Sequence, residues 1–257
     1  MTVLILGGTS EAAALARACA AAGLTDCLIS LAGRTAAPRA LPLPVRVGGF
    51  GGADGLAAFI RENAITALVD ATHPFAARIS ANAAQAVAQT SLPALTLHRA
   101  GWVRQPGDIW LEVPGLEEAV EALGPAPHRV FLTIGRQGLH AFARAPQHHY
   151  LARTIEPVGD VLRVPHLTEL NARGPFDAAA EAALMRREKV DVLVTKHSGG
   201  ASTYGKVEAA RRLGLPVVMI ARPASTGLPA TEQVEDALAF VKAHLPPSCT
   251  GPFSSPA

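Results

Sequence analysis

The sequence of 257 residues predicts an α/β fold with two Rossmann-like, doubly wound parallel-sheet domains and a ligand cleft between them. Short aliphatic runs alternate with stretches of helical periodicity, which is typical of right-handed βαβ units. The alternation loosens after Arg99 and restarts at Arg129, so the chain contains two such series. The predicted organisation is 1–99 for an N-terminal dinucleotide-binding domain, 100–128 for a connecting segment, 129–245 for a second Rossmann-like domain and 246–257 for a disordered tail.

In the first half, four consecutive aliphatic residues starting at Val3 predict a strand buried on both faces. Gly7-Gly8 ends this strand before an Ala-rich run that favours a helix from about Ser10 to Ala22. Further strands are expected at 27–31, 45–47, 64–70 and 92–97, with a short helix around 56–60 and a longer one from Pro74 to about Ala88.

The second half repeats this alternation. Strands are expected at 129–134, 190–195 and 216–221, and helices at 139–144, 176–184, 203–213 and 234–241. Pro157 and Pro165 are expected to limit regular structure before the helix near 176. His148-His149 has no third ligand at metal spacing, so we interpret these two residues as surface histidines.

Composition excludes several classes of function. A net charge of +2 and 5% aromatic residues argue against a nucleic-acid partner. The three cysteines (Cys19, Cys27 and Cys249) support neither a disulfide framework nor a metal site. No leader-like start is present and no apolar run approaches the ~18 residues that a membrane span needs. We therefore expect a cytoplasmic protein without membrane contact.

Ligands of open parallel sheets bind outside the carboxyl ends of the strands, so the residues directly after each strand are the functional candidates. Three such segments lie in the first half and two in the second. They are Gly7–Ser10, Gly33–Arg34, Thr72–Phe75, Ile134–Arg136 and Lys196–Gly200. A ligand that spans a cleft between the two sheets is the simplest geometric interpretation.

The first of these segments favours an anion, because a glycine turn at a helix N-terminus presents backbone N–H groups to a phosphate. The dinucleotide fingerprint Gly-x-Gly-x-x-Gly is incomplete, since Thr9 and Ala12 occupy two of its glycine positions. A plain turn with a Ser/Thr cap is the alternative. Arg34 lies where an arginine accommodates a 2′-phosphate, which favours NADP over NAD and counts against a methyltransferase; the alternative is a solvated surface arginine.

Three further segments keep two interpretations each. His73 can give or take a proton, or pair with a carboxylate, although Thr72-His73-Pro74 is also a plausible helix start. Lys196–Gly200 resembles a cradle for phosphate or carboxylate but lacks P-loop spacing, and a polar glycine loop is the alternative. Arg136 after Gly135 is an anion clamp or a surface charge.

The sequence lacks the motifs of several other enzyme classes that act with nicotinamide cofactors or by hydrolysis. The Tyr-x-x-x-Lys pair of short-chain dehydrogenases is missing, since Tyr150 is followed at that distance by Thr154 and Tyr204 by Glu208. No Gly-x-Ser-x-Gly elbow and no kinase-type loop occurs.

Four segments together resemble the precorrin-6A reductase family of cobalamin biosynthesis. They are Ile5–Ala12, Asp70–Ala76, Thr133–Arg136 and Thr195–Gly200, and their order and spacing match from Thr2 to about Leu245. Asp-Ala-Thr-His-Pro-Phe-Ala is the most specific of these strings. The Lys-x-Ser-Gly-Gly loop is present, with His197 between Lys196 and Ser198.

The resemblance implies NADPH-dependent reduction of one double bond of precorrin-6A to give precorrin-6B. A hydride passes to a ring carbon and a proton is added at its neighbour, while Arg and His side chains pair with the many carboxylates of the tetrapyrrole. His73 and Lys196 are candidate proton donors, with water as another. By matching positions, cofactor binding is assigned to Gly7, Gly8, Thr9 and Ser10 (pyrophosphate), Arg34 (2′-phosphate), Thr72 (inner end), and Gly135, Arg136, Lys196, Ser198 and Gly199. No metal is implied.

Two alternatives to this enzyme stay open: a non-catalytic NADP(H)-sensing module and a tetrapyrrole methyltransferase. The sequence also leaves open whether the substrate is channelled through transient contact with neighbouring pathway enzymes.

Overall fold

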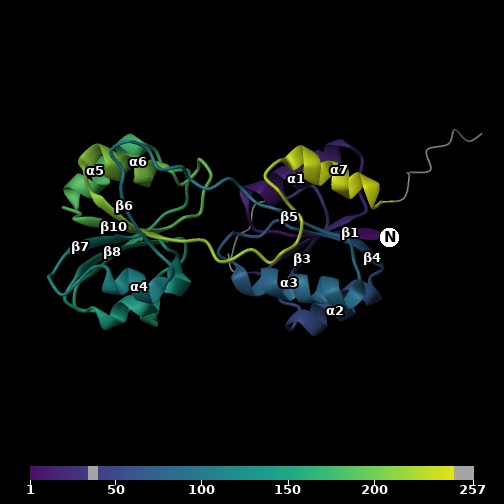
Figure 1. The fold of residues 1–257 in the computed structure, drawn as a ribbon, viewed down its shortest axis with the longest axis horizontal. Coiled ribbons are helices and arrows are strands. Elements are labelled where there is room, and N and C mark those ends of the chain that lie inside the picture. The colour runs from purple at the N-terminus through teal and green to yellow at the C-terminus, as the bar shows by residue number, and fades with distance from the viewer. Residues whose placement is uncertain (34–39, 246–257) are drawn as a thin grey trace, which may run out of the picture. The chain divides into compact units, whose positions relative to one another are not determined.

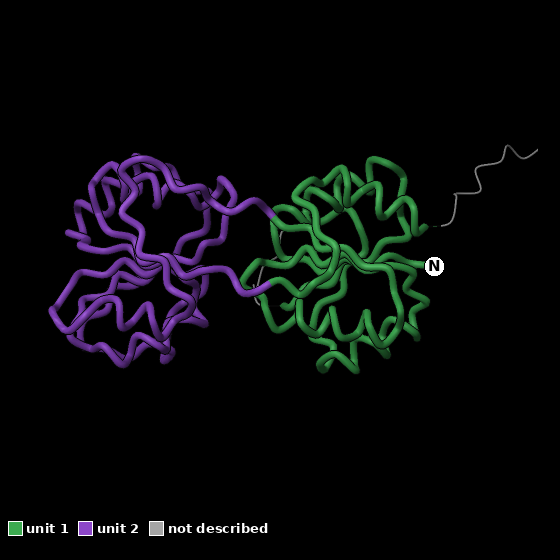
Figure 2. Tube along the Cα trace, viewed as in Figure 1, with its two compact units in different colours: residues 1–98, 225–257 green, residues 99–224 purple. Residues whose placement is uncertain are grey.

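The computed structural model describes residues 1–33 and 40–245 and divides into two compact units (Figures 1 and 2). Unit 1 contains Met1–His98 together with the chain from Ser225 on, and unit 2 contains Arg99–Ala224. The chain therefore passes between the units twice. The predicted tail, 246–257, lies outside the described residues.

The described part of unit 1 forms one six-stranded parallel sheet in the order β12-β5-β4-β1-β2-β3. The sheet grows outward from β1 to β3 on one side and from β4 to β5 on the other, so the strand order reverses between β1 and β4, which is the pattern of a doubly wound sheet. The strands are β1 (Thr2–Leu6), β2 (Cys27–Leu31), β3 (Val45–Val47), β4 (Ile65–Asp70), β5 (Ala94–Leu97) and β12 (Ala230–Thr231).

Helices cover both faces of this sheet. On one face, Val3 and Ile5 pack in a cluster with α1 (Ser10–Ala21) and α7 (Val234–Ala243). On the other, Leu4 and Leu6 pack with α2 (Ala53–Glu62) and α3 (Ala77–Thr90). The alternation of side chains along β1 explains why its sequence is continuously apolar, and Figure 1 shows the two helical layers.

Unit 2 repeats the arrangement, with a six-stranded parallel sheet among its residues in the order β6-β11-β10-β7-β8-β9. Its strands are β6 (Ile109–Val113), β7 (Arg129–Leu132), β8 (His149–Thr154), β9 (Leu167–Asn171), β10 (Val192–Lys196) and β11 (Pro216–Ile220). Its helices are α4 (Leu116–Glu121), α5 (Ala178–Arg187) and α6 (Gly205–Leu213), with 3-10 helices η1 (Arg136–Arg144) and η2 (Gly159–Val161). The predicted α/β class with two doubly wound parallel sheets is confirmed.

The predicted segment boundaries differ from this division in two places. The predicted connector 100–128 supplies β6 and α4 to the sheet of unit 2. The stretch 225–245, predicted to end the second domain, supplies β12 and α7 to unit 1. Hydrogen bonds join β12 to β5, and Val241 of α7 is buried in the core around α1. Apolar periodicity marks an element but does not say which sheet it joins.

Smaller differences concern local conformation. The predicted helix 139–144 is a 3-10 helix that starts at Arg136. β9 forms in the stretch where prolines were expected to limit regular structure, and helix α3 starts at Ala77 rather than at Pro74. Cys19 and Cys27 are free buried thiols, and Cys249 lies outside the described residues.

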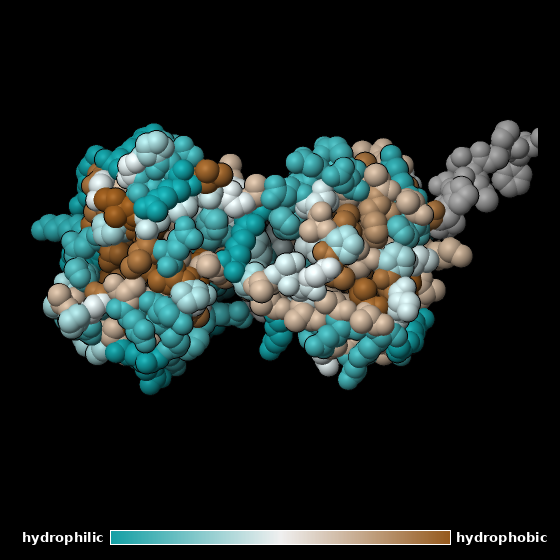
Figure 3. Space-filling view, in the orientation of Figure 1, coloured by the Kyte–Doolittle hydropathy of each residue, from teal (hydrophilic) through white to brown (hydrophobic). Residues whose placement is uncertain are grey.

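The surface is mixed in polarity. On the face shown in Figure 3, hydrophilic residues separate smaller groups of apolar ones. Four of the exposed aliphatic side chains belong to strands at a sheet edge: Val45 and Val47 of β3, and Ile109 and Leu111 of β6. Within the described ranges, no helix combines the length and the apolar character that a bilayer span requires.

Candidate active site

The turn after β1 is built by two glycines with different tasks. Gly7 packs against β2, because a Cβ there would lie 3.1 Å from Ile29 Cγ2 and 3.3 Å from Leu31 Cδ2. Gly8 has φ +116° with open space around it, a left-handed backbone that other residues rarely adopt. Gly7 therefore allows the turn to pack closely against β2, and Gly8 provides the conformation of the turn itself.

Thr9 caps helix α1. Its Oγ1 accepts the N–H of Ala12 at 3.1 Å, and its backbone is extended, as expected for an N-cap. Within residues 1–33 and 40–245, the N–H groups of Gly8, Thr9 and Ser10 donate to no acceptor. Three donors at the positive end of a helix dipole make this turn suited to an anion. The Ser10 hydroxyl donates to the carboxylate of Glu11.

The glycine turn and the loop after β4 meet. Strands β1 and β4 are neighbours, with Leu6 opposite Asp70, and the Leu6 carbonyl accepts the N–H of Ala71 at 2.9 Å. The Thr9 hydroxyl donates to the Ala71 carbonyl at 2.7 Å, which locks the two loops together. In this strand order the boundary between β1 and β4 is the topological switch point, where ligands of such sheets bind.

Asp70 organises the second loop. It is only 2% exposed, and its Oδ1 accepts the backbone N–H of Thr72 at 3.1 Å and the Thr72 hydroxyl at 2.7 Å. The Thr72 oxygen also lies 3.3 Å from Ser80 Oγ of α3. Thr72 is thereby held in place, with its proton committed to Asp70. The sequence prediction of functional residues omitted Asp70 and Ser80, although a carboxylate at the end of a buried strand is a recognisable signal.

His73 is half-buried in the same loop. Its Nδ1 accepts the N–H of Phe75 at 3.1 Å, and its carbonyl accepts the N–H of Ala76 at 2.7 Å. A lone pair on Nδ1 means that the neutral ring carries its proton on Nε2. His73 thus combines a fixed ring orientation with a donor at Nε2.

The other site residue predicted in the first half cannot be placed, because Arg34 lies outside the described residues. The residue before it, Gly33, has φ +70°, and a Cβ there would lie 2.8 Å from Val47 Cγ1 of β3. The structure therefore shows where the chain leaves β2, whereas the position of Arg34 stays a prediction.

In unit 2, the turn after β7 differs from its counterpart in unit 1. Gly135 has φ +78° and open space around it, and η1 follows in place of an α-helix. Arg136 is exposed, and its Nε donates to the Val158 carbonyl at 3.3 Å. Arg136 thereby ties η1 to the backbone before η2.

The loop after β10 holds Lys196, Ser198 and Gly199, which the sequence assigned to the cofactor. The backbone N–H of Ser198 donates to the Lys196 carbonyl at 2.7 Å, and that of His197 donates to the Ile220 carbonyl at 2.8 Å. Lys196 and Ser198 are half-buried and Gly199 is buried. All three lie at the carboxyl edge of the sheet of unit 2.

A buried charged cluster lies beside this loop. Arg153, near the end of β8, donates from Nη1 to Glu181 Oε1 at 2.6 Å, and its guanidinium lies 3.6 Å from the ring centroid of Phe176. Lys206 of α6 is 4% exposed, and its Nζ lies 5.6 Å from the ring centroid of Trp102. Burial, reinforced by the positive Arg153 and opposed by Glu181, lowers the pKa of Lys206 to about 7. The sequence analysis missed this cluster, because no motif marks charges that meet only in the fold.

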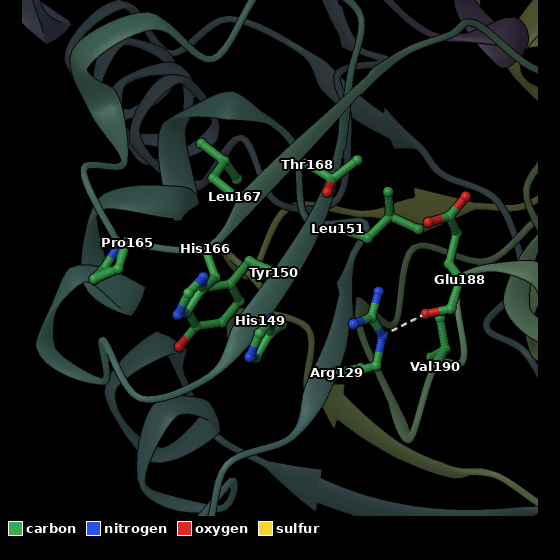
Figure 4. Close-up of a pocket in the computed structure, with 10 residues that line it drawn as sticks. All are labelled: Arg129, His149, Tyr150, Leu151, Pro165, His166, Leu167, Thr168, Glu188 and Val190. Carbon is green, nitrogen blue, oxygen red and sulfur yellow. Dashed lines mark hydrogen bonds between the residues drawn. The ribbon is translucent and has the colours of Figure 1, made fainter.

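A pocket of about 280 Å³ lies at the opposite, amino edge of the same sheet (Figure 4). Arg129 and His149 are the first residues of β7 and β8, and Arg129 Nε donates to the Glu188 carbonyl at 2.6 Å. The rings of His149 and His166 stack with centroids 4.2 Å apart. None of the predicted site residues lines this pocket, and we do not assign the active site to it.

The interpretation of His148-His149 as surface histidines is wrong for the first of them. His148 is 0% exposed, and its Nδ1 accepts the N–H of His128 at 3.1 Å. Burial and the neighbouring His128 lower the pKa of His148. Across the described residues, no group of three His, Cys, Asp or Glu is arranged to hold a metal ion.

Two sheets of one strand order define the class of the protein: it is a doubly wound α/β protein, and the switch point of unit 1 carries a turn suited to an anion. Comparison then gives the family. The chain belongs to the family described as precorrin-6x reductase CbiJ/CobK, whose model matches residues 2–242.

Individual relatives agree with this assignment. The chain is 50% identical over 246 residues to a precorrin-6A reductase of Sinorhizobium sp, which covers 96% of this chain and 94% of that protein. It is 46% identical over 242 residues to a precorrin-6A reductase of Rhodobacter capsulatus, covering 94% and 96%. The solved structure of a CobK precorrin-6A reductase matches with a TM-score of 0.89 and 46% identity over 95% of this chain and 97% of that one.

Proposed function

We propose that this protein is an NADPH-dependent oxidoreductase that reduces one double bond of the precorrin-6A macrocycle to give precorrin-6B in cobalamin biosynthesis. The observation that carries the proposal is the hydrogen bond from Thr9 Oγ1 to the Ala71 carbonyl, which sets the glycine turn beside the Asp70–Thr72 loop at the switch point. The second support is similarity: the chain is 50% identical, over 96% of its length, to a precorrin-6A reductase.

The turn fits the pyrophosphate of a dinucleotide. The N–H groups of Gly8, Thr9 and Ser10 supply donors, and Gly8 without a side chain lets the backbone approach a phosphate closely. Because the Thr9 proton is committed to Ala71, its backbone N–H rather than its hydroxyl is the donor that we assign to the phosphate. When bound, NADPH supplies the hydride. Arg34 is assigned to the 2′-phosphate, which would make the site prefer NADPH over NADH.

The remaining residues of the proposal orient the reactants and handle the proton. Asp70 holds Thr72, whose oxygen keeps a lone pair for a donor on the inner end of the cofactor. His73, with its proton on Nε2, and Lys196, with its ammonium group, are the two protein candidates for protonating the ring carbon next to the reduced one.

The assignment of unit 2 residues to the cofactor stands as part of the same proposal. Gly135, Arg136, Ser198 and Gly199 are assigned through the family resemblance, and the arginine and lysine charges of these loops suit phosphate or carboxylate groups. A tetrapyrrole with many carboxylates is the proposed substrate class.

The test is an anaerobic incubation of the purified protein with precorrin-6A and NADPH. Loss of nicotinamide absorbance should match, mole for mole, a macrocycle that gains two hydrogens by mass spectrometry. NADPH deuterated at its transferable position should deliver deuterium to the product. NADPH binding without turnover would favour the sensing module instead. Calorimetric binding of S-adenosylmethionine, with no NADPH binding, would favour the methyltransferase.

A further inference from the structure

Arg222, two residues past β11, holds three backbone carbonyls with its guanidinium group. Its Nε donates to the His197 carbonyl at 2.9 Å, its Nη2 to the Ser198 carbonyl at 3.1 Å, and its Nη1 to the Arg99 carbonyl at 3.0 Å. One side chain thereby joins the Lys196–Gly200 loop to Arg99, the first residue of unit 2. A planar fork with fixed donors suits this task, and an ammonium group cannot reproduce it.

Trp102 makes a second connection between the same two segments. Its Nε1 donates to the Gly200 carbonyl at 2.7 Å, and its own carbonyl lies 2.9 Å from His197 Nε2. Since a carbonyl only accepts, His197 carries a proton on Nε2. The rings of Trp102 and His197 also meet edge to face, with centroids 6.0 Å apart. His197, which lies between Lys196 and Ser198 in the loop, is thus part of the connection.

The two glycines of the loop allow this close approach. Gly199 has φ +72°, and a Cβ there would lie 2.0 Å from the Ala100 carbonyl oxygen. Gly200 has φ +73°, and a Cβ there would lie 2.8 Å from Arg99 Cδ. Gly199 therefore requires glycine for conformation and for space, whereas Gly200 requires it for conformation, since the Arg99 side chain can move. Glycine pairs carry a large conformational entropy, so the loop needs outside contacts to keep one geometry.

We propose that Arg222 is a positioning residue: together with Trp102 it fixes the Lys196–Gly200 loop in one conformation, so that Lys196 and Ser198 are pre-set for their ligands. This inference rests on the proposed role of Lys196 and Ser198 in the site. The guanidinium of Arg222 acts on the loop through carbonyl groups, and we assign it no contact with cofactor or substrate. A loop that is already held in its binding conformation raises the rate, because the entropy cost of ordering it is not paid when the ligand binds.

The primary test compares Arg222→Ala with Arg212→Ala, which removes an arginine of α6 that pairs with Glu208 on the same helix. Arg222→Ala should speed amide exchange of residues 197–200 at least about tenfold. It should also lower kcat for precorrin-6A by up to about 100-fold, with a smaller effect on KM, because a misplaced catalytic loop costs rate. Added guanidinium ion should restore part of kcat, whereas Arg222→Lys should not. Arg212→Ala should change neither the amide exchange of residues 197–200 nor kcat.

Two further variants keep the proposal testable if Arg222→Ala does not fold. Trp102→Phe keeps an aromatic ring but removes the Nε1 donor and part of the indole, so it should speed exchange of the loop to a smaller extent. Gly199→Ala should disrupt the loop, whereas Gly214→Ala, at φ +65° with nothing within 4 Å, should only add backbone strain.

The outcomes separate this inference from the proposed function. Unchanged loop exchange and unchanged kcat in Arg222→Ala would overturn the inference. A different result would spare the inference about Arg222 and count against the proposed function. If Lys196→Ala and Ser198→Ala keep full activity while Arg222→Ala still loosens the loop, then Arg222 does fix the loop, but the assignment of the loop to the site fails.

Discussion

Unit 1 and unit 2 are built on one strand order, β3-β2-β1-β4-β5 in the first and β9-β8-β7-β10-β11 in the second, and each adds a sixth strand beside the last. They differ in the helix that comes after the central strand. In unit 1 a capped α-helix of 12 residues starts at Ser10, whereas in unit 2 the 3-10 helix η1 starts at Arg136. Only the first arrangement offers aligned N–H groups at an α-helix start, so equal topology does not mean equal ligand capacity.

The interiors of the units differ as well. Among the described residues, the buried polar or charged side chains of unit 1 are Ser30 and Asp70. Those of unit 2 are Asp108, His148, Arg153, Thr154, Glu181, Thr195 and Lys206. Charged groups out of water are costly unless paired, so unit 2 carries the larger cost of buried polar side chains.

The largest expected effect separates the two central turns. Gly7→Val should lower NADPH affinity about 100-fold or more, because the added side chain meets Ile29 and Leu31 of β2 and displaces the turn. Gly135→Val, in the turn after the central strand of unit 2, has open space around it. Beyond the strain of a positive φ, about 1–2 kcal/mol of stability, it should weaken NADPH binding far less than Gly7→Val does. Titration of nicotinamide fluorescence measures the affinity. An equal loss in both variants would mean that the turns are not functionally different.

A second contrast concerns the arginines located after strands in the two units. Arg34→Ala should weaken NADPH binding about 10- to 100-fold and leave NADH binding nearly unchanged, because a charge-assisted contact to the 2′-phosphate is lost. Arg136→Ala, which removes a donor to the Val158 carbonyl, should change the preference for NADPH over NADH far less. Binding isotherms for both cofactors decide the point. A retained preference in Arg34→Ala would remove this residue from the site.

A third expected effect uses the buried lysine of unit 2. The pKa of Lys206 falls from its ordinary value of 10.5 to about 7 in the folded protein. Between these pH values the unfolded chain binds more protons, so this group makes unit 2 more stable as pH rises from about 7 to 10.5 and least stable below pH 7. Lys206→Met should remove this dependence and stabilise unit 2 at pH 6 by on the order of a few kcal/mol.

Both tryptophans of the chain, Trp102 and Trp110, lie in unit 2, so denaturation followed by tryptophan fluorescence reports on that unit. The exposed Lys242 of α7 in unit 1 provides the control, since Lys242→Met should leave this transition unchanged at every pH. A pH profile that is the same for wild type and Lys206→Met would contradict a buried, weakly basic lysine.

The same two units illustrate which features a sequence can and cannot predict. Continuous aliphatic runs such as the one at Val3 predicted strands well, because strands covered on both faces are apolar throughout. The glycine turn, Thr72 and the Lys196 loop were chosen as site candidates because ligands bind at carboxyl strand ends, and in the structure they follow β1, β4 and β10. β12 was missed because it has only two residues, and its sheet is set by hydrogen bonds to β5, more than a hundred residues earlier in the chain. Arg222 and Lys206 were missed because their roles depend on partners distant in sequence, such as Arg99 and Arg153.

The smallest expected effect compares two helix caps. Thr9→Val removes the hydroxyl that caps α1 and binds the Ala71 carbonyl, so it should destabilise unit 1 by about 1–2 kcal/mol and also weaken NADPH binding several-fold. In unit 2, Asp177→Ala removes a cap that accepts the N–H groups of Ala179 and Ala180. Asp177→Ala should lower the stability of unit 2 by a similar amount. It should leave NADPH affinity unchanged, because within the described residues the Asp177 side chain, unlike that of Thr9, makes no hydrogen bond to a carbonyl of a site loop. Thr9→Ser should retain both properties. If Thr9→Val lost stability alone, Thr9 would be a cap like Asp177, and the link to Ala71 would have no part in holding the site together.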